Sequence, residues 1–404
     1  MSGTATYDVI IIGAGVVGAS AALAAVRHGA KVALVDAGFA GQASGAGAGI
    51  VSPVALDRGE GRPEWTSVIT RCVGHYRELL PIVDALDPAG VGSGMFRQVG
   101  ELVVARRDPD ERATLAGIKA RLSTEVGRRA HGVSTSPADV DGSEVRKYWP
   151  ELREDLVGLF IGDVGRVVGS QLTARLITSA IRLGHEQGHR SGLTVIPGLA
   201  RATSDGTAKD LNVGQDRLSA GAVIVATGAW PVPGAEGLGL RVDVRPVRGQ
   251  IVHLRLRNVP TGDRPVVNTI GAGYLLGFDD RVVVGATHED VGFDARVTAG
   301  GQHAVLDAAL ELAPGLAGAG LIETRVGLRP VSSDGLPLIG AVAPGIHIVT
   351  GLGAWGLTLG PLLGQLAAEE ALGHPLPAWL EFLSPLRMPP SAQEAGDPIR
   401  TGAA

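Results

Sequence analysis

Three glycines near the start of the chain have the spacing of a loop that binds a dinucleotide. Gly13, Gly15 and Gly18 follow the β-branched run 9–12 and open an apolar helical pattern that continues to about His28. In such a loop the first glycine allows a tight turn, the second lets the backbone approach a pyrophosphate, and the third lets the helix lie close to the strand. The N–H groups at the start of the helix are expected to hold the phosphates.

An acidic residue completes this strand–turn–helix–strand unit. Residues 31–35 form a second apolar run, and Asp36 ends it. A carboxylate in this place can accept a hydrogen bond from a ribose hydroxyl and disfavours a 2′-phosphate, which argues against NADP. The alternative is a glycine-rich turn in an ordinary βαβ unit, and the complete context makes that the weaker interpretation.

A second glycine-rich segment follows directly behind Asp36. Residues 41–50 alternate glycine with alanine, which makes a poor helix but allows close approach of a ligand. The position favours contact with the rest of a dinucleotide over a flexible loop.

A third glycine turn lies near the C-terminal end. The apolar run 346–350 is followed by glycines at 351, 353, 356 and 360, with Pro361 expected in the first helical turn and Gly373 at the helix end. Reduction of a flavin places negative charge on one edge of its ring system, and fixed N–H donors at a helix start stabilise that charge. A nicotinamide has no such requirement, so two helix starts directed at one cofactor favour FAD over NAD.

Composition limits the remaining classes. The chain has 404 residues and a formal net charge of −5, which gives no reason to expect a nucleic-acid partner. Its one cysteine, Cys72, excludes an internal disulfide and is expected to be a buried thiol. The uncharged stretch 9–26 contains three glycines after a β-run, so a membrane span is not expected, and a cytoplasmic protein is predicted.

One apparent metal motif is rejected. His185, Glu186 and His189 match the H-E-x-x-H pattern of zinc proteases. Gly188 lies within the motif at a helix end, and no third ligand follows at a telling distance, so a solvated helix end and no metal are predicted.

The rest of the chain alternates between two kinds of segment. A helix is expected at 66–86, strands at 95–105 and 156–168, an arginine-rich helix at 109–127, and a polar loop at 131–143. Ser170 is expected to cap a helix that ends near Gly188, and the strands 193–196 and 222–226 would return to a parallel sheet. Further strands are expected between about 240 and 295, followed by a helix at 301–312.

Taken together, these motifs resemble the D-amino-acid oxidase family of FAD enzymes, in the branch that contains glycine oxidase and monomeric sarcosine oxidase. The resemblance rests on the first glycine loop with Asp36, on 43–49, on 225–230, on 327–330 with 334–340, and on the turn 351–360. It implies an α/β fold with a Rossmann-type FAD domain and a discontinuous mixed-sheet α+β substrate domain. The FAD domain would comprise 1–90, 169–235 and 325–404, and the substrate domain 91–168 and 236–324.

The resemblance also implies site residues. Arg329 would bind the substrate carboxylate through its planar guanidinium, Tyr274 would assist through its hydroxyl, and Ile50 would line the flavin face. An ion pair for Arg329 with Glu323 or Asp334, and a packed aromatic role for Tyr274, stay open. The residues expected to bind noncovalent FAD are Gly13, Ala14, Gly15, Val16, Val17, Gly18, Asp36, Ala37, Ser44, Gly45, Ala48, Gly49, Ile50, Leu199, Ala226, Thr227, Gly228, Trp230, Arg329, Gly353, Ala354, Trp355, Gly356, Leu357 and Thr358.

The implied reaction oxidises the CH–NH bond of glycine, a D-amino acid or an N-methyl amino acid by hydride transfer to flavin N5. The imino acid then gives a keto acid and an amine or ammonia, with oxygen as acceptor. Two departures matter: Ala272 stands where glycine oxidase has a histidine, and none of the four lysines lies in a flavin segment. A dehydrogenase that uses a quinone or another acceptor, and a noncatalytic flavin-binding subunit of a larger complex, therefore remain alternatives. A homo-oligomer is compatible with all three.

Overall fold

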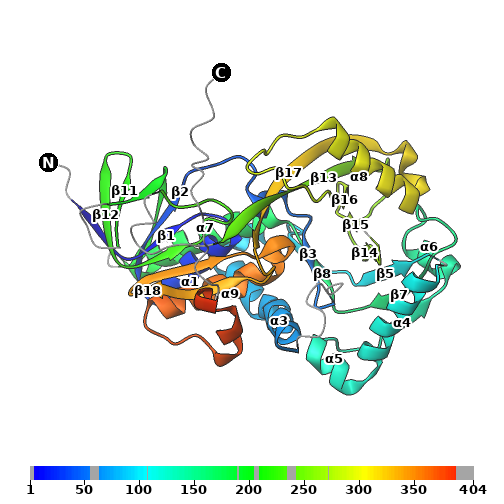
Figure 1. The fold of residues 1–404 in the computed structure, drawn as a ribbon, viewed down its shortest axis with the longest axis horizontal. Helices are drawn as coiled ribbons and strands as arrows, with labels where there is room; N and C mark the ends of the chain where they lie inside the picture. The colour runs from blue at the N-terminus through cyan, green and yellow to red at the C-terminus, as the bar shows by residue number, and fades with distance from the viewer. Residues whose placement is uncertain are drawn as a thin grey trace.

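The computed structural model describes residues 4–54, 63–106, 108–188, 191–203, 209–233, 243–271 and 273–387. Within these residues the strands form two eight-stranded sheets and one three-stranded sheet. Figure 1 shows the first sheet with its helices on the left and the second sheet with its helices on the right. No helix in the described part of the chain has the length and apolar character needed to cross a membrane.

The first sheet contains the predicted strand–turn–helix–strand unit. Its central strands run parallel in the order β12, β1, β2 and β9, and β19 lies parallel on the other side of β12. The antiparallel strands β10, β11 and β18 complete it. The strands are β1 (Ala5–Ile12), β2 (Lys31–Asp36), β9 (Gly192–Pro197), β10 (Ala200–Ala202), β11 (Asp210–Val213), β12 (Asp216–Val225), β18 (Leu338–Ala343) and β19 (Ile346–Thr350).

One face of this sheet is covered by four helices, which share its core of buried aliphatic side chains. They are α1 (Val16–Arg27), α3 (Pro63–Leu86), α7 (Gly169–Gln187) and α9 (Gly356–Ala371). Helices α1 and α9 pack closely because glycines face the contact: a Cβ on Gly364 would lie 2.3 Å from the carbonyl oxygen of Val17. The starts of the two helices therefore lie side by side, although more than three hundred residues separate them (Figure 1).

The second sheet is mixed and has the order β17-β13-β16-β15-β14-β5-β7-β6. All its neighbours are antiparallel except β14 and β5. The strands are β5 (Glu101–Ala105), β6 (Ala138–Val140), β7 (Val157–Ile161), β13 (Val244–Arg255), β14 (Val266–Thr269), β15 (Tyr274–Gly277), β16 (Val282–Gly285) and β17 (Gly320–Ser332).

Helices lie on both faces of the second sheet. Helix α8 (Ala299–Leu312) and α6 (Gly142–Tyr148) contribute to the core of one face, and α4 (Pro109–Ser123) covers the other. Helix α5 (Glu125–His131) packs against α3 and α4. The three-stranded sheet contains β3 (Ile50–Val51), β8 (Gly165–Val167) and β4 (Phe96–Gln98). The remaining elements are the short helix α2 (Ala43–Ala46) and the 3₁₀ turns η1 (Pro88–Gly90), η3 (Pro314–Gly318), η4 (Gly353–Trp355), η5 (Ala378–Leu383) and η6 (Pro385–Arg387).

Strand β17 joins the two halves of the molecule. It pairs with β13 along its whole length, yet Leu328 also donates its N–H to the carbonyl of Gly41 at 2.8 Å, and Val331 forms a bridge with Leu352. This strand crosses the boundary predicted at residue 325. The domain division itself stays a prediction.

Several local predictions were wrong. Residues 41–50 contain the helix α2, and the expected loop 131–143 contains β6 and the start of α6, whose Asp141 caps the helix with a capping box. The N-cap of α7 is Val168 rather than Ser170, because the helix begins at Gly169, two residues earlier than predicted.

Two predicted continuous elements are each divided. The helix expected at 109–127 breaks at Thr124, whose side chain caps α5, and the strand expected at 95–105 breaks at Gly100, which has a positive φ of 78°. Pro361 is the sixth residue of α9, past the first turn where it was predicted.

Candidate active site

A large cavity lies between the two main sheets and receives the starts of α1 and α9. Its volume is about 1290 Å³. This exceeds the 300–1,000 Å³ typical of sites for drug-sized ligands, and it gives room for a dinucleotide and a small substrate together.

Most predicted cofactor residues line this cavity. They are Gly13, Gly15, Val16, Val17, Asp36, Ala37, Ser44, Ala48, Gly49, Ile50, Leu199, Ala226, Thr227, Gly228, Trp230, Arg329, Gly353, Ala354, Trp355, Gly356, Leu357 and Thr358. Ala14, Gly18 and Gly45 are not among the lining residues. Gly18 instead packs the helix on the strand, since a Cβ there would lie 1.8 Å from the Gly13 carbonyl oxygen.

The turn after β1 has the backbone geometry that a phosphate-binding loop needs. Gly13 has a φ of 104°, and a Cβ there would lie 2.3 Å from the carbonyl oxygen of Ala226. A Cβ on Gly15 would lie 3.0 Å from the Ser44 hydroxyl oxygen, which itself accepts the Val16 N–H at 3.0 Å. Bare backbone thus forms the cavity wall at the start of α1, where the helix dipole favours an anion.

The carboxylate of Asp36 braces this turn from the next strand. One oxygen accepts the Ala14 N–H at 2.6 Å, and the other accepts the Gly38 N–H at 2.7 Å and the Gln42 side-chain amide at 3.0 Å. Asp36 also lines the cavity. These residues fit a dinucleotide: an anion-binding helix start and an acceptor for a ribose hydroxyl lie in one wall.

The predicted substrate residues share one face of the second sheet. Arg329 pairs with Val247 across β17 and β13, and Tyr274 pairs with Gly285 across β15 and β16. Directly paired residues project to the same side, as do residues two apart on a strand, so Arg329, Gly249, Gly285 and Tyr274 share one face of the sheet. Of these, Arg329, Gly249 and Tyr274 line the cavity.

Two glycines make room for the two side chains. A Cβ on Gly249 would lie 2.3–2.4 Å from three atoms of the Arg329 guanidinium, and a Cβ on Gly285 would lie 2.6 Å from the Tyr274 hydroxyl. The guanidinium therefore lies flat over β13 and the hydroxyl over β16, on adjacent strands. Arg329 donates to the carbonyl oxygens of Thr287 at 3.0 Å and Arg248 at 3.4 Å.

The two acids considered as ion-pair partners of Arg329 have other hydrogen-bond partners. Glu323 accepts from Arg325, and Asp334 accepts from Arg387. Burial raises the pKa of Tyr274 to about 12, although the nearby Arg329 charge acts in the opposite direction. Tyr274 is therefore a neutral hydroxyl at physiological pH and can donate a hydrogen bond to a ligand in the cavity.

A buried acid on the same sheet face escaped the sequence analysis. Glu101 has no exposed surface, and its carboxylate accepts from the Ser52 hydroxyl at 2.7 Å and from the Asn268 side-chain amide. All three residues line the cavity. The signal in the sequence was a glutamate at the start of an otherwise apolar strand, which needs a polar partner wherever it is buried.

Replacing Glu101 by glutamine is expected to remove a pH-dependent loss of stability. Burial raises the Glu101 pKa from its ordinary value of 4.5 to about 7, against the opposing effect of its two hydrogen bonds. The folded protein therefore keeps a proton that the unfolded chain has lost, and the free energy of unfolding falls as pH rises between these values. The loss is about 3 kcal/mol at about 1.4 kcal/mol per pKa unit. Denaturant unfolding with saturating FAD at pH 5 and pH 8 should show a smaller difference for Glu101→Gln; an unchanged difference would contradict the assignment.

Gly249→Ala is expected to raise KM for carboxylate substrates by a factor on the order of ten to a hundred, because the new methyl group displaces the guanidinium of Arg329. Gly300→Ala on α8 is the matched control, since a Cβ there meets nothing within 4 Å. Steady-state kinetics of the two variants gives the comparison. Equal KM values would show that the contact between Gly249 and Arg329 is unimportant.

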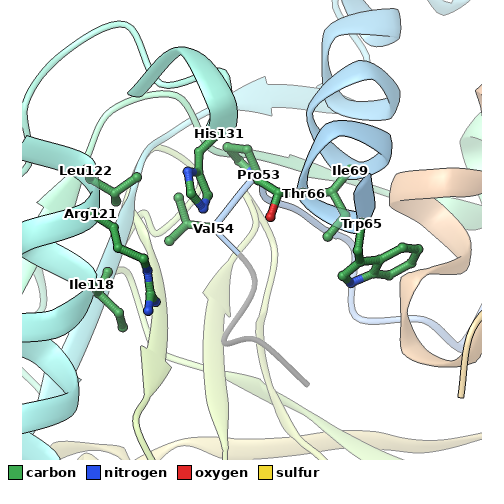
Figure 2. Close-up of a pocket in the computed structure, with 9 residues that line it drawn as sticks. All are labelled: Pro53, Val54, Trp65, Thr66, Ile69, Ile118, Arg121, Leu122 and His131. Atoms are coloured by element: carbon green, nitrogen blue, oxygen red, sulfur yellow. The ribbon is translucent and has the colours of Figure 1, made fainter. Parts of the chain in front are cut away.

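A small pocket adjoins the large cavity. Figure 2 shows Arg121 and Ile118 of α4, His131 of α5, and Trp65 and Ile69 of α3 around Val54. Its volume of about 20 Å³ accommodates about one water molecule, so it is an extension of the main cavity rather than a separate site. Four of its residues, Val54, Trp65, Ile118 and Arg121, line both.

No metal site accompanies the cavity in the part of the chain that the structure describes, where no group of three or more His, Cys, Asp or Glu side chains could hold an ion. His189 of the rejected zinc motif lies outside the described residues, as does Ala272. Cys72 is fully buried in the core around α3, where burial raises the pKa of its thiol.

Comparison with known proteins decides the family. Residues 8–370 match the DAO family, described as FAD dependent oxidoreductase. The chain belongs to this family. The DAO-type FAD fold and the predicted cofactor class are thereby confirmed.

Similar proteins cover nearly the whole chain. The uncharacterized oxidoreductase YurR of Bacillus subtilis (strain 168) is 36% identical over 90% of this chain and 94% of its own length. Iminodiacetate oxidase (IdaA) from Chelativorans sp. BNC1 has a TM-score of 0.80 with 38% identity, and covers 93% of this chain and 98% of its own. Glycine oxidase from Geobacillus kaustophilus also has a TM-score of 0.80, with 26% identity over 95% of this chain and all of its own.

Proposed function

We propose that this DAO family enzyme oxidises the CH–NH bond of a small amino acid, namely glycine, a D-amino acid or an N-methyl or other N-substituted glycine. The coarse class, an FAD-dependent amino-acid oxidase or dehydrogenase, follows from family membership. The product is an imino acid that water hydrolyses to a keto acid and an amine or ammonia. Oxygen is the proposed electron acceptor, and the cytoplasm is the proposed location.

The observation that carries this proposal is the pairing of Arg329 and Tyr274 over two glycines, beside the helix starts that fit the cofactor. Bound FAD would supply the oxidising chemistry by accepting a hydride at N5. Arg329 would hold the substrate carboxylate through its two parallel N–H groups, and Tyr274 would donate a further hydrogen bond. The cavity walls would exclude water and fix the Cα–H direction. The two similar enzymes named for amino-acid substrates, glycine and iminodiacetate, support this class.

The cofactor is proposed to be noncovalent. Cys72 lies in the α3 core and is not among the residues that line the cavity. Trichloroacetic acid precipitation of the yellow protein should leave the flavin in the supernatant.

One observation favours a different electron acceptor. Three of the lysines have contacts away from the cavity: Lys31 lies over the Tyr7 ring, Lys119 pairs with Asp139, and Lys209 packs against Gly345. No lysine is among the described residues that line the cavity. The sarcosine oxidase branch uses an active-site lysine for the reaction with oxygen. An enzyme without such a lysine fits a dehydrogenase that uses a quinone or similar acceptor.

Anaerobic mixing with a panel of amino acids tests both candidates. Bleaching of the flavin absorbance by glycine, N-methylglycine, iminodiacetate or a D-amino acid is expected. Readmitted air should restore the colour within seconds for an oxidase, and slow recovery that a soluble quinone accelerates would identify a dehydrogenase. A flavin that no amine or amino acid bleaches would support the noncatalytic subunit instead.

A further inference from the structure

The polar cluster around Glu101 lies too far from Arg329 to serve the substrate's α-amine. Asn268 of β14 pairs with Tyr274 of β15, whose hydroxyl extends back over Gly285 of β16. Two strand spacings, about 10 Å at about 4.8 Å each, therefore separate the hydroxyl from the Asn268 position along the sheet. The amine of an α-amino acid lies within about one residue length, roughly 3.6 Å, of its carboxylate.

The hydrogen bonds of Asn268 fix which of its atoms is available to a ligand. Its amide nitrogen donates to one carboxylate oxygen of Glu101, and the Ser52 hydroxyl donates to the other. Glu101 is therefore the acceptor in both hydrogen bonds. The carbonyl oxygen of the Asn268 amide consequently points elsewhere. Among the described residues no donor to this oxygen is recorded, and Asn268 is partly exposed and lines the cavity.

We propose that Asn268 forms a distal substrate subsite, in which its amide oxygen accepts an N–H or O–H from the end of the substrate opposite the carboxylate. Glu101 is the positioning residue that orients the amide, because it accepts the hydrogen bond from the amide nitrogen. This inference rests on the proposed function, because it assumes that Arg329 and Tyr274 hold the substrate carboxylate. It predicts preference for an amino acid whose N-substituent or side chain carries a terminal ammonium, amide or hydroxyl group.

The α4 side of the cavity suggests a competing possibility, in which a cationic side chain binds an anionic distal group. Thr114, Ile118 and Arg121 of α4 line the cavity, and the Arg121 side chain is exposed with no ion pair recorded to any described residue. If Arg121 dominated, the distal group would be an anion such as a second carboxylate. The burial of Glu101 and its hydrogen bond from the Asn268 amide nitrogen favour the donor-binding alternative, because they leave the amide oxygen to meet the ligand.

Three carboxylic acids of matched length separate these outcomes without turnover, since none carries an α-amine. They are 5-aminopentanoate, hexanoate and adipate, which place an ammonium, a methyl and a carboxylate group at the same distance from the first carboxylate. Perturbation of the flavin absorbance of the holoenzyme measures each Kd. The wild-type protein is expected to bind 5-aminopentanoate at least tenfold more tightly than hexanoate. Equal affinities, no binding of any probe, or tightest binding of adipate would overturn the proposal.

Variants assign the preference to the named residues. Asn268→Leu should abolish the preference while hexanoate binds as well as before. Glu101→Leu should also lose it, whereas Glu101→Gln, which keeps an acceptor for the Asn268 amide, should retain more of it. If all three variants keep the wild-type ratio, Asn268 does not form the subsite.

The Arg329→Ala variant distinguishes a failure of the distal subsite from a failure of the proposed function. It should weaken all three probes by a similar factor without changing their ranking. A flavin that no amino acid reduces, together with the expected probe ranking, would refute the proposed function and leave the subsite in place. A flavin that an amino acid does reduce, together with a probe ranking other than the expected one, would refute the subsite alone.

Discussion

Replacing Arg329 by alanine should lower kcat/KM for amino-acid substrates by about 3 kcal/mol, a factor on the order of a hundred, while FAD stays bound. The guanidinium lies over bare backbone at Gly249 beside the Tyr274 hydroxyl, and its removal leaves a substrate carboxylate with one neutral donor. Flavin content and steady-state kinetics measure the two effects separately.

The matched control is Arg255→Ala. Arg255 lies on β13 of the same sheet, is exposed, and bonds the backbone of Asp280. It should change neither flavin content nor kcat/KM. Undiminished turnover of an amino acid by Arg329→Ala would refute the carboxylate role, and loss of FAD from this variant would show that Arg329 serves the cofactor instead.

Replacing Gly13 by alanine should abolish FAD binding and lower stability. The residue has a φ of 104°, and the new Cβ would lie 2.3 Å from the carbonyl oxygen of Ala226, the residue that follows β12. Backbone cannot yield as a flexible side chain can, so β1 and β12 must separate at the phosphate-binding turn. A loss of at least about 3 kcal/mol is expected, of which about 1–2 kcal/mol is left-handed backbone strain.

Gly29→Ala isolates that strain from the steric clash. Gly29 ends α1 with a φ of 81°, but a Cβ there meets nothing within 4 Å. This variant should lose only the conformational part, about 1–2 kcal/mol, and should stay yellow. Denaturant unfolding and the absorbance ratio of flavin to protein give both quantities, and equal behaviour of the two variants would show that the contact with Ala226 does not matter.

The cofactor half of the molecule was predictable because local sequence determines it. Gly13, Gly15 and Gly18 fix a turn that few other residues allow, and the alternation of apolar runs with glycine turns indicates parallel strands. Failures there were the short helix α2 and the ends of longer elements, such as the Val168 cap of α7. These depend on one or two hydrogen bonds that periodicity does not record.

The substrate half was less accessible, because its site arises from strand register. One sheet face carries Glu101, Asn268 and Tyr274 only because β14 pairs in parallel with β5 and antiparallel with β15. The first and last of these residues are 173 positions apart in the sequence. No local pattern encodes such a register. Family resemblance identified Arg329 and Tyr274, whereas Glu101 and Asn268 needed the three-dimensional structure.

The connections of β17 have a consequence for the order in which ligands bind. The strand carries Arg329, and its neighbours Leu328 and Val331 are hydrogen-bonded or bridged to Gly41 and Leu352, which flank the two glycine segments expected around FAD. Bound cofactor that orders those two segments also orders the guanidinium of Arg329. By thermodynamic linkage, a carboxylate bound to Arg329 then stabilises bound FAD to the same extent. Flavin loading should therefore precede tight carboxylate capture, and hexanoate should slow the escape of FAD from the holoenzyme in wild type but not in Arg329→Ala.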